Sequence, residues 1–268
     1  MHIFNCELYL CHYRVRESAM FRAIGIICFL FVPSSIACNG ELWMKYSGDQ
    51  LVKGHDGNFY MYQTSYKAID ADGAPNAYHP DNIGLDHLAN AGYPNKGWKN
   101  VLVVDPKQPQ KPFVQTTGDF KGYFLSKTTL EDKSKPPTDS KRYVNSVEIP
   151  YIVFPGNFYS LKGTGLKGDI GYAYNAKTKK SSAFVFADIG PKSAPLGEMS
   201  IALAERLGGI NVNPRNGSGL PSGDILYIVF PYSSRVHKWP MTIKELEVAV
   251  EQMMQLNSVS LGAYQSCF

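Results

Sequence analysis

The sequence lacks a dense basic segment and a strong excess of either charge. Its 268 residues carry a formal net charge of +4, and the longest Lys-rich stretch covers only residues 177–180. Proteins that bind nucleic acid usually concentrate Lys and Arg in a patch or stripe. The composition therefore predicts no nucleic-acid partner. The sequence also has no internal repeat, which excludes a solenoid.

Motifs for nucleophilic or metal-dependent chemistry are also missing. There is no Gly-x-Ser-x-Gly motif, and His79, His87 and His237 do not show the spacing of metal ligands. Residues 70–73 read Asp-Ala-Asp-Gly, like the start of a calcium loop, but no bidentate Glu follows at the required distance. We therefore expect a plain turn at Asp72, no metal and no cofactor.

No apolar run is long enough to cross a membrane comfortably. The longest covers residues 23–32 after Arg22, whereas a membrane-spanning helix needs about 20 apolar residues. A short basic region, an apolar run and then small residues at Ser35 and Ala37 are typical of a secretory signal. The sequence therefore predicts a signal peptide over residues 1–37 and a secreted or periplasmic chain without stable membrane insertion.

Few cysteines remain in the predicted exported chain. Cleavage before Cys38 leaves Cys38 and Cys267 of the five cysteines, and Met20 is an equally good start for the signal. Two cysteines in an oxidising compartment favour a disulfide, worth ~4 kcal/mol in the entropic account of loop closure. The alternative is a lipid on Cys38, but lipoprotein signals usually carry Leu where this chain has Ser35.

Strand-forming and turn-forming residues are abundant, with 17 Tyr, 14 Phe, 24 Gly and 17 Pro. This composition favours a mainly β (α+β) domain over long helical repeats. Short apolar runs bounded by Gly, Pro or charge predict strands at residues 58–70, 101–104, 122–125, 151–154, 170–174, 183–187 and 225–230. Short strands at this spacing indicate a barrel or a sandwich.

Two helices are predicted among the strands. Residues 200–207 place their apolar side chains near one face and are followed by two glycines. Thr242 and Glu245 have the spacing of a capping box, which opens a second helix. We expect one monomeric domain over residues 38–268.

Residues 183–200 contain the best candidates for chemistry. A predicted buried strand ends at Asp188, Gly190 and Pro191 turn the chain, and Glu198 lies where a helix begins. Alone, Asp188 is explained as a turn-capping residue and Glu198 as a first-turn helix carboxylate. The strand end and the helix start can deliver both carboxylates to one cleft, which makes them candidates for a catalytic pair.

The order of strand, Asp-x-Gly-Pro, loop and small helix resembles the double-psi β-barrel signature of the expansin-like, rare lipoprotein A-like and family 45 endoglucanase barrels. Gly197, Glu198 and Ser200, with residues 66–73 and 148–155, look more narrowly like the family 75 chitosanases. The resemblance extends over residues 58–235. Fungal members usually carry cysteines near residues 70–73, and this chain has none there.

The resemblance implies a six-stranded double-psi β-barrel core with extra strands and two short peripheral helices. It also implies an inverting endo-hydrolase of β-1,4-linked glucosamine polymers, with Asp188 as acid and Glu198 as base by analogy. One carboxyl must protonate the leaving oxygen while the other activates water. Substrate contacts are expected at Asp70, Asp72 and Tyr66. A polycationic substrate requires that acidic residues gather in the folded chain.

Two alternatives use the same barrel. One is a peptidoglycan-active lytic transglycosylase, which needs a single acid and no water-activating base, and the other is an expansin-like wall-binding module without catalysis. A functional Glu198 distinguishes the hydrolase from both. Tyr78, Tyr93 and Trp98 are expected either to stack on sugar rings or to pack in the core.

Overall fold

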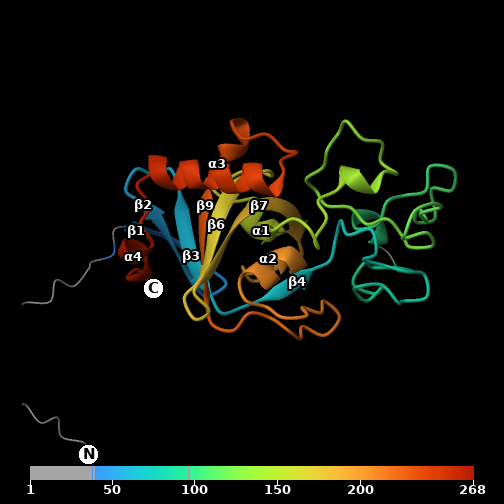
Figure 1. Cartoon of the computed structure of the whole chain (residues 1–268), viewed down its shortest axis with the longest axis horizontal. Helices are drawn as coiled ribbons and strands as arrows, with labels where there is room; N and C mark the ends of the chain where they lie inside the picture. The colour runs from blue at the N-terminus through green and yellow to red at the C-terminus, as the bar shows by residue number, and fades with distance from the viewer. Residues whose placement is uncertain (1–37, 39, 96) are drawn as a thin grey trace, which may run out of the picture. The chain divides into compact units, whose positions relative to one another are not determined.

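A mixed β-sheet forms the centre of the structure (Figure 1). This computed structural model describes residue 38, residues 40–95 and residues 97–268, so the predicted signal peptide lies outside the described residues. The strands are β1 (Gly40–Tyr46), β2 (Asp49–Gly54), β3 (Tyr60–Thr64), β4 (Ala68–Asp70), β5 (Tyr151–Pro155), β6 (Ile170–Asn175), β7 (Lys180–Gly190), β8 (Glu198–Ser200) and β9 (Ile225–Phe230).

The nine strands are hydrogen-bonded in the order β1-β2-β3-β9-β6-β7-β5-β8-β4. β5 runs parallel to β7, and β4 runs parallel to β8. The other pairs are antiparallel. The predicted mainly β class is therefore confirmed, and the strands predicted at residues 170–174 and 183–187 pair as a hairpin of β6 and β7.

Within the described part of the chain, four α-helices accompany the sheet: α1 (Gly156–Tyr159), α2 (Ile201–Arg206), α3 (Ile243–Leu256) and α4 (Leu261–Gln265). Both predicted helices are present as α2 and α3. The capping box of α3 forms, since the Glu245 amide donates to the Thr242 hydroxyl and the Thr242 amide donates to the Glu245 carboxylate. No helix among the described residues is long and apolar enough to span a membrane.

Alternation along the strands produces two apolar layers, one on each face of the sheet. Tyr60 and Tyr62 of β3 point into a cluster with residues of α1 and α2, whereas Met61 points into a cluster with residues of α3 and α4. Figure 1 shows α3 lying across the sheet. Apolar side chains therefore pack against both faces of the sheet.

Residues 71–150 are mostly irregular. The strands predicted at residues 101–104 and 122–125 are wrong: these segments form isolated bridges, including Leu102 with Ser126 and Tyr78 with Phe124. Turns and bends near these bridges keep a longer ladder from forming. The predicted strand at residues 58–70 is divided into β3 and β4, because β3 pairs with β9 and β4 pairs with β8.

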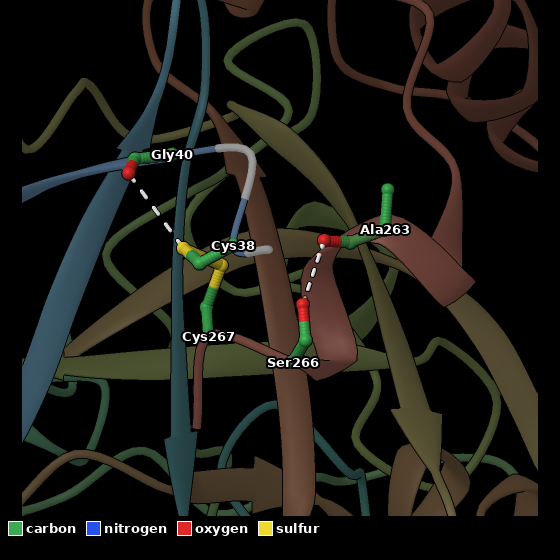
Figure 2. Close-up of a disulfide and its surroundings, with 5 residues drawn as sticks. All are labelled: Cys38, Gly40, Ala263, Ser266 and Cys267. Atoms are coloured by element: carbon green, nitrogen blue, oxygen red, sulfur yellow. Dashed lines mark hydrogen bonds between the residues drawn. A yellow bond between two sulfur atoms is a disulfide. The ribbon is translucent and has the colours of Figure 1, made fainter. Parts of the chain in front are cut away.

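Cys38 and Cys267 are joined by a disulfide (Figure 2). Cys38 precedes the edge strand β1 and Cys267 follows α4, with 229 residues of separation and Cα atoms 4.6 Å apart. Tyr264 of α4 packs edge-on against Phe59, with ring centroids 5.5 Å apart. The disulfide and this contact fasten the end of the chain to the sheet.

Candidate active site

Strand pairing places Asp188 and Glu198 on either side of one residue, Val153. β5 lies between β7 and β8, and Val153 is the register partner of Asp188 on one side and of Glu198 on the other. Residues directly opposite one another on paired strands point to the same face of a sheet. The two predicted catalytic carboxylates therefore share a face, one strand apart.

β4 adds a second pair of carboxylates from an earlier part of the chain. Its parallel pairing with β8 sets Ala68 opposite Glu198 and Asp70 opposite Ser200, and Asp72 follows just after the strand. One carboxylate oxygen each from Asp70, Asp72 and Asp188 lie within 4.8 Å of one another. Together with Glu198, these side chains line a pocket of about 540 Å³.

Asp188 is buried and held by main-chain donors. One of its oxygens, Oδ1, accepts hydrogen bonds from the amides of Thr129, at 3.0 Å, and Ile189, at 2.8 Å. Burial raises the pKa of Asp188 to about 6, although these hydrogen bonds and the charge of Lys167 act in the opposite direction. Donors aimed at a carboxylate favour its ionised form.

Glu198 lies in a different environment. It is partly buried, and its carboxylate accepts no hydrogen bond from the described residues. Burial is the main cause that raises the pKa of Glu198 to about 7, and the negative charges of Asp188 and Asp86 add to it. The surroundings of Asp188 therefore favour its ionised form more than the surroundings of Glu198 do.

Asp70 and Asp72 are both buried beside the pair. The Asp72 amide donates to Asp70 Oδ1 at 2.8 Å, and the buried Tyr151 hydroxyl donates to the Asp72 carbonyl at 3.0 Å. Burial raises the pKa of both carboxyls well above the ordinary value, and the charges of the neighbouring acids raise it further. The pocket is therefore a concentrated acidic site in a chain of positive net charge.

The other residues predicted for the site are distributed differently. Tyr66 is 41% exposed and is not part of the pocket lining, although the charge of Glu198 helps to raise its pKa after burial. Tyr78 lines the pocket, whereas Trp98 is buried and packs edge-on against Tyr93 with ring centroids 6.2 Å apart. Trp98 is thus a core residue.

Two residues that form or support the pocket wall, Asp86 and Arg215, were not predicted from the sequence. Asp86 is buried in the pocket wall and accepts hydrogen bonds from the Asn90 amide at 2.9 and 3.1 Å. The guanidinium of Arg215 donates to the carbonyls of Asn82, Gly84 and Asp86, and so fixes the loop that carries this wall. The sequence around Asp86 and Arg215 has no periodicity that would have predicted the contact between them.

A larger hollow, of about 680 Å³, lies between the turn before β3 and the end of α3. Its lining includes Lys53, Tyr232 and His237 but no carboxylate from the described residues. Acid–base chemistry with paired carboxyls is therefore available in the acidic pocket and not in this hollow.

Comparison with protein-family models gives no match for this chain, and comparison with curated protein sequences gives none either.

Proposed function

We propose that this protein is an endo-acting glycoside hydrolase of the chitosanase type, which cleaves β-1,4-linked glucosamine polymers by an inverting mechanism with two carboxyls. The observation that carries the proposal is the placement of Asp188 and Glu198 on either side of Val153, on one face of the sheet and in one pocket. Glycosidases of this kind need two carboxyls on opposite sides of the bond that breaks.

The strand spacing supports the inverting outcome. Adjacent strands lie about 4.8 Å apart, so the backbones that carry the two carboxyls are separated by roughly 10 Å. Inverting enzymes hold their carboxyl groups about 6.5 to 9.5 Å apart, which leaves room for a water, whereas retaining enzymes hold them about 5 to 5.5 Å apart. Two side chains that extend from strands one strand apart fit the wider range.

The hydrogen bonds support one assignment of roles. Asp188 accepts from two main-chain amides and suits the ionised group, so we assign it as the base that takes a proton from water. Glu198 accepts no hydrogen bond from the described residues and burial raises its pKa to about 7, so it suits the acid that protonates the leaving oxygen. This order is the reverse of the one that analogy with related barrels suggested, because main-chain donors support the ionised form of Asp188 and not that of Glu198.

The acidity of the pocket supports a cationic substrate. Asp70, Asp72 and Asp86 line the same pocket as the pair, although the chain as a whole carries +4. A positive charge bound beside these carboxyls favours their ionised forms, and the ionised forms in turn attract it. An unacetylated glucosamine polymer carries an ammonium group on each sugar and matches this field. A neutral chitin chain would gain nothing from it.

We also propose a double-psi β-barrel topology and export from the cytoplasm for this chain. The parallel pairs β5–β7 and β4–β8 within an otherwise antiparallel sheet support the double-psi β-barrel topology that the resemblance implies. The disulfide supports export to the cell exterior or periplasm. A sulfur in that disulfide is not free to carry a lipid, which favours the unanchored form of Cys38.

The experiment that tests this function is product analysis on chitosan, chitin and peptidoglycan side by side. The proposal predicts short glucosamine oligomers from chitosan, with loss of the products in Glu198→Gln. Anhydro-sugar products from peptidoglycan would instead support the lytic transglycosylase. Binding to all polymers without any product would support the expansin-like module.

A further inference from the structure

The acidic pocket contains a cluster that catalysis by two carboxyls does not require. Asp70, Asp72 and Asp188 each place a carboxylate oxygen within 4.8 Å of the other two. The described part of the chain has ion pairs at His79–Asp81, Glu131–Arg142 and Arg206–Glu247, and none involves these three carboxylates. Three carboxyl groups therefore lie close together without a basic partner in direct contact.

One oxygen of this cluster lacks any partner. Asp72 is only 9% exposed, and its Oδ1 is buried without a hydrogen bond from the described residues. A buried carboxylate oxygen that is left unpaired costs free energy unless a ligand satisfies it. Asp72 lines the pocket beside Asp70 and Asp188 and contributes one oxygen to the cluster, so a bare ion seated among the three carboxyl groups would lie beside the Asp72 carboxyl.

Main-chain amides orient the carboxylates of Asp70 and Asp188. Asp70 Oδ1 accepts from the Asp72 amide, and Asp188 Oδ1 accepts from the amides of Thr129 and Ile189. Donors of this kind fix the direction of a metal-ligating carboxylate and leave its second oxygen for the ion. The cluster thus has the support that a cation site requires.

The ligand set selects the class of cation. All three donors are carboxylate oxygens, which prefer hard cations to the softer transition metals. Calcium binds oxygens at about 2.3 to 2.6 Å, so two of its ligands lie at most roughly 5 Å apart. Magnesium binds at about 2.0 to 2.1 Å and needs a tighter, near-octahedral set. The observed spacing suits calcium better.

We propose that Asp70, Asp72 and Asp188 bind one hard divalent cation, calcium before magnesium or manganese. From the sequence, residues 70–73 were expected to form a plain turn, because no bidentate Glu follows them. The structure brings a third carboxylate from β7, a distant part of the chain, which the spacing of residues 70–73 cannot show. Water completes the coordination from the open side of the pocket.

The cation would compete with hydrolysis, and this consequence alone rests on the proposed function. Asp188 belongs both to the cation site and to the catalytic pair. A carboxylate that ligates a divalent cation cannot at the same time take a proton from water. Calcium should therefore slow chitosan hydrolysis, and a chelator should not abolish it.

The test is calorimetric titration of the purified, chelator-treated protein at pH 8 with calcium, magnesium and manganese chloride in separate runs. The proposal predicts one calcium site per chain and a melting temperature that rises with calcium, because a ligand that binds only the folded state stabilises it. No binding of any of the three ions up to ~10 mM, well above the weakest calcium sites of extracellular proteins, would overturn it.

Variants locate the site. Asp72→Asn should weaken calcium binding at least ~10-fold, yet in chelator it should melt no lower than the wild type, because it removes one acid from a buried cluster of acids that repel one another. Asp70→Asn serves as the second variant if Asp72→Asn does not fold. Asp86→Asn is the matched control, since Asp86 is buried in the same pocket but lies outside the cluster, and it should retain calcium binding.

The outcomes separate the cation site from the proposed function. Calcium binding without chitosan hydrolysis in any condition would leave the site standing and remove the function. Hydrolysis without cation binding would do the opposite. Binding of glucosamine at the cluster, lost in Asp72→Asn, with no divalent ion bound would overturn the cation site.

Discussion

Asp188 and Glu198 are both register partners of Val153, one through a parallel pair and one through an antiparallel pair. This relationship places the two carboxyls on one face of the sheet, because both residues lie opposite Val153 on the strands to either side of it. The apolar layers that pack on both faces of the sheet oppose any shift of the strands that carry these two carboxyls.

Removal of either titratable group should abolish most hydrolysis. Asp188→Asn and Glu198→Gln keep the shape of each side chain, and each should lower kcat on chitosan at least ~100-fold, the scale of a lost general acid or base. Glu205→Gln, on the exposed side of α2, is the control and should keep normal turnover. If Glu198→Gln keeps near-normal turnover while Asp188→Asn loses it, the paired mechanism is wrong.

A methyl group placed beside Glu198 should displace its carboxylate. A Cβ at Gly190 would lie 2.9 Å from Glu198 Oε2 and 3.1 Å from Val153 Cγ1. Gly190→Ala should therefore lower kcat about 10-fold, since misplacement of a catalytic group by a fraction of an ångström is costly. The melting temperature should change little, because the flexible end of Glu198 can move.

Gly156→Ala is the matched control for this change. Its Cβ would meet Lys192 at 3.5 Å and the Gly190 carbonyl oxygen at 3.7 Å, both ordinary van der Waals contacts. Gly156 lies in α1 and is not among the residues that line the pocket. Equal loss of turnover in both alanine variants would show that Gly190→Ala acts through general disturbance and not through Glu198.

The rate should depend on pH as expected for one ionised and one protonated carboxyl. In chelator, kcat/KM should rise with pH as Asp188 loses its proton near pH 6 and fall as Glu198 loses its proton near pH 7. The two limbs describe the coupled pair and not either residue alone. A rate that keeps rising above pH 8 would contradict the assignment of Glu198 as the acid.

Loss of the disulfide should destabilise the chain without removing the site. Cys38→Ser combined with Cys267→Ser should lower the free energy of unfolding by about 4 kcal/mol, since the bond closes a loop over most of the domain. Urea unfolding measures the difference, and reduced wild type should match the variant. Identical midpoints for oxidised wild type and variant would show that the bond contributes nothing.

Local signals in the sequence predicted much of this fold. The capping box at Thr242 and Glu245 depends on residues three positions apart, so it is visible before folding. Asp188 and Glu198 are also close in sequence, with only a turn and a loop between them. Such features need no knowledge of distant pairing.

The remainder depends on long-range contacts. Asp72 meets Asp188 only because β4 pairs with β8 and β8 pairs with β5, which no local pattern records. The same reason explains why Asp86 and Arg215 were not predicted and why Tyr66, although next to β4, does not line the pocket. Residues 71–150 owe their path to turns and isolated bridges, which sequence periodicity does not detect.

The most direct measurement is the anomeric form of the first product released from chitosan, followed by proton NMR in the minutes before mutarotation. Inversion at a β-1,4 linkage gives the α-anomer first, and the separation of Asp188 and Glu198 by one strand predicts this result. Initial release of the β-anomer would mean that a carboxyl attacks the sugar directly, and it would contradict the inverting pair.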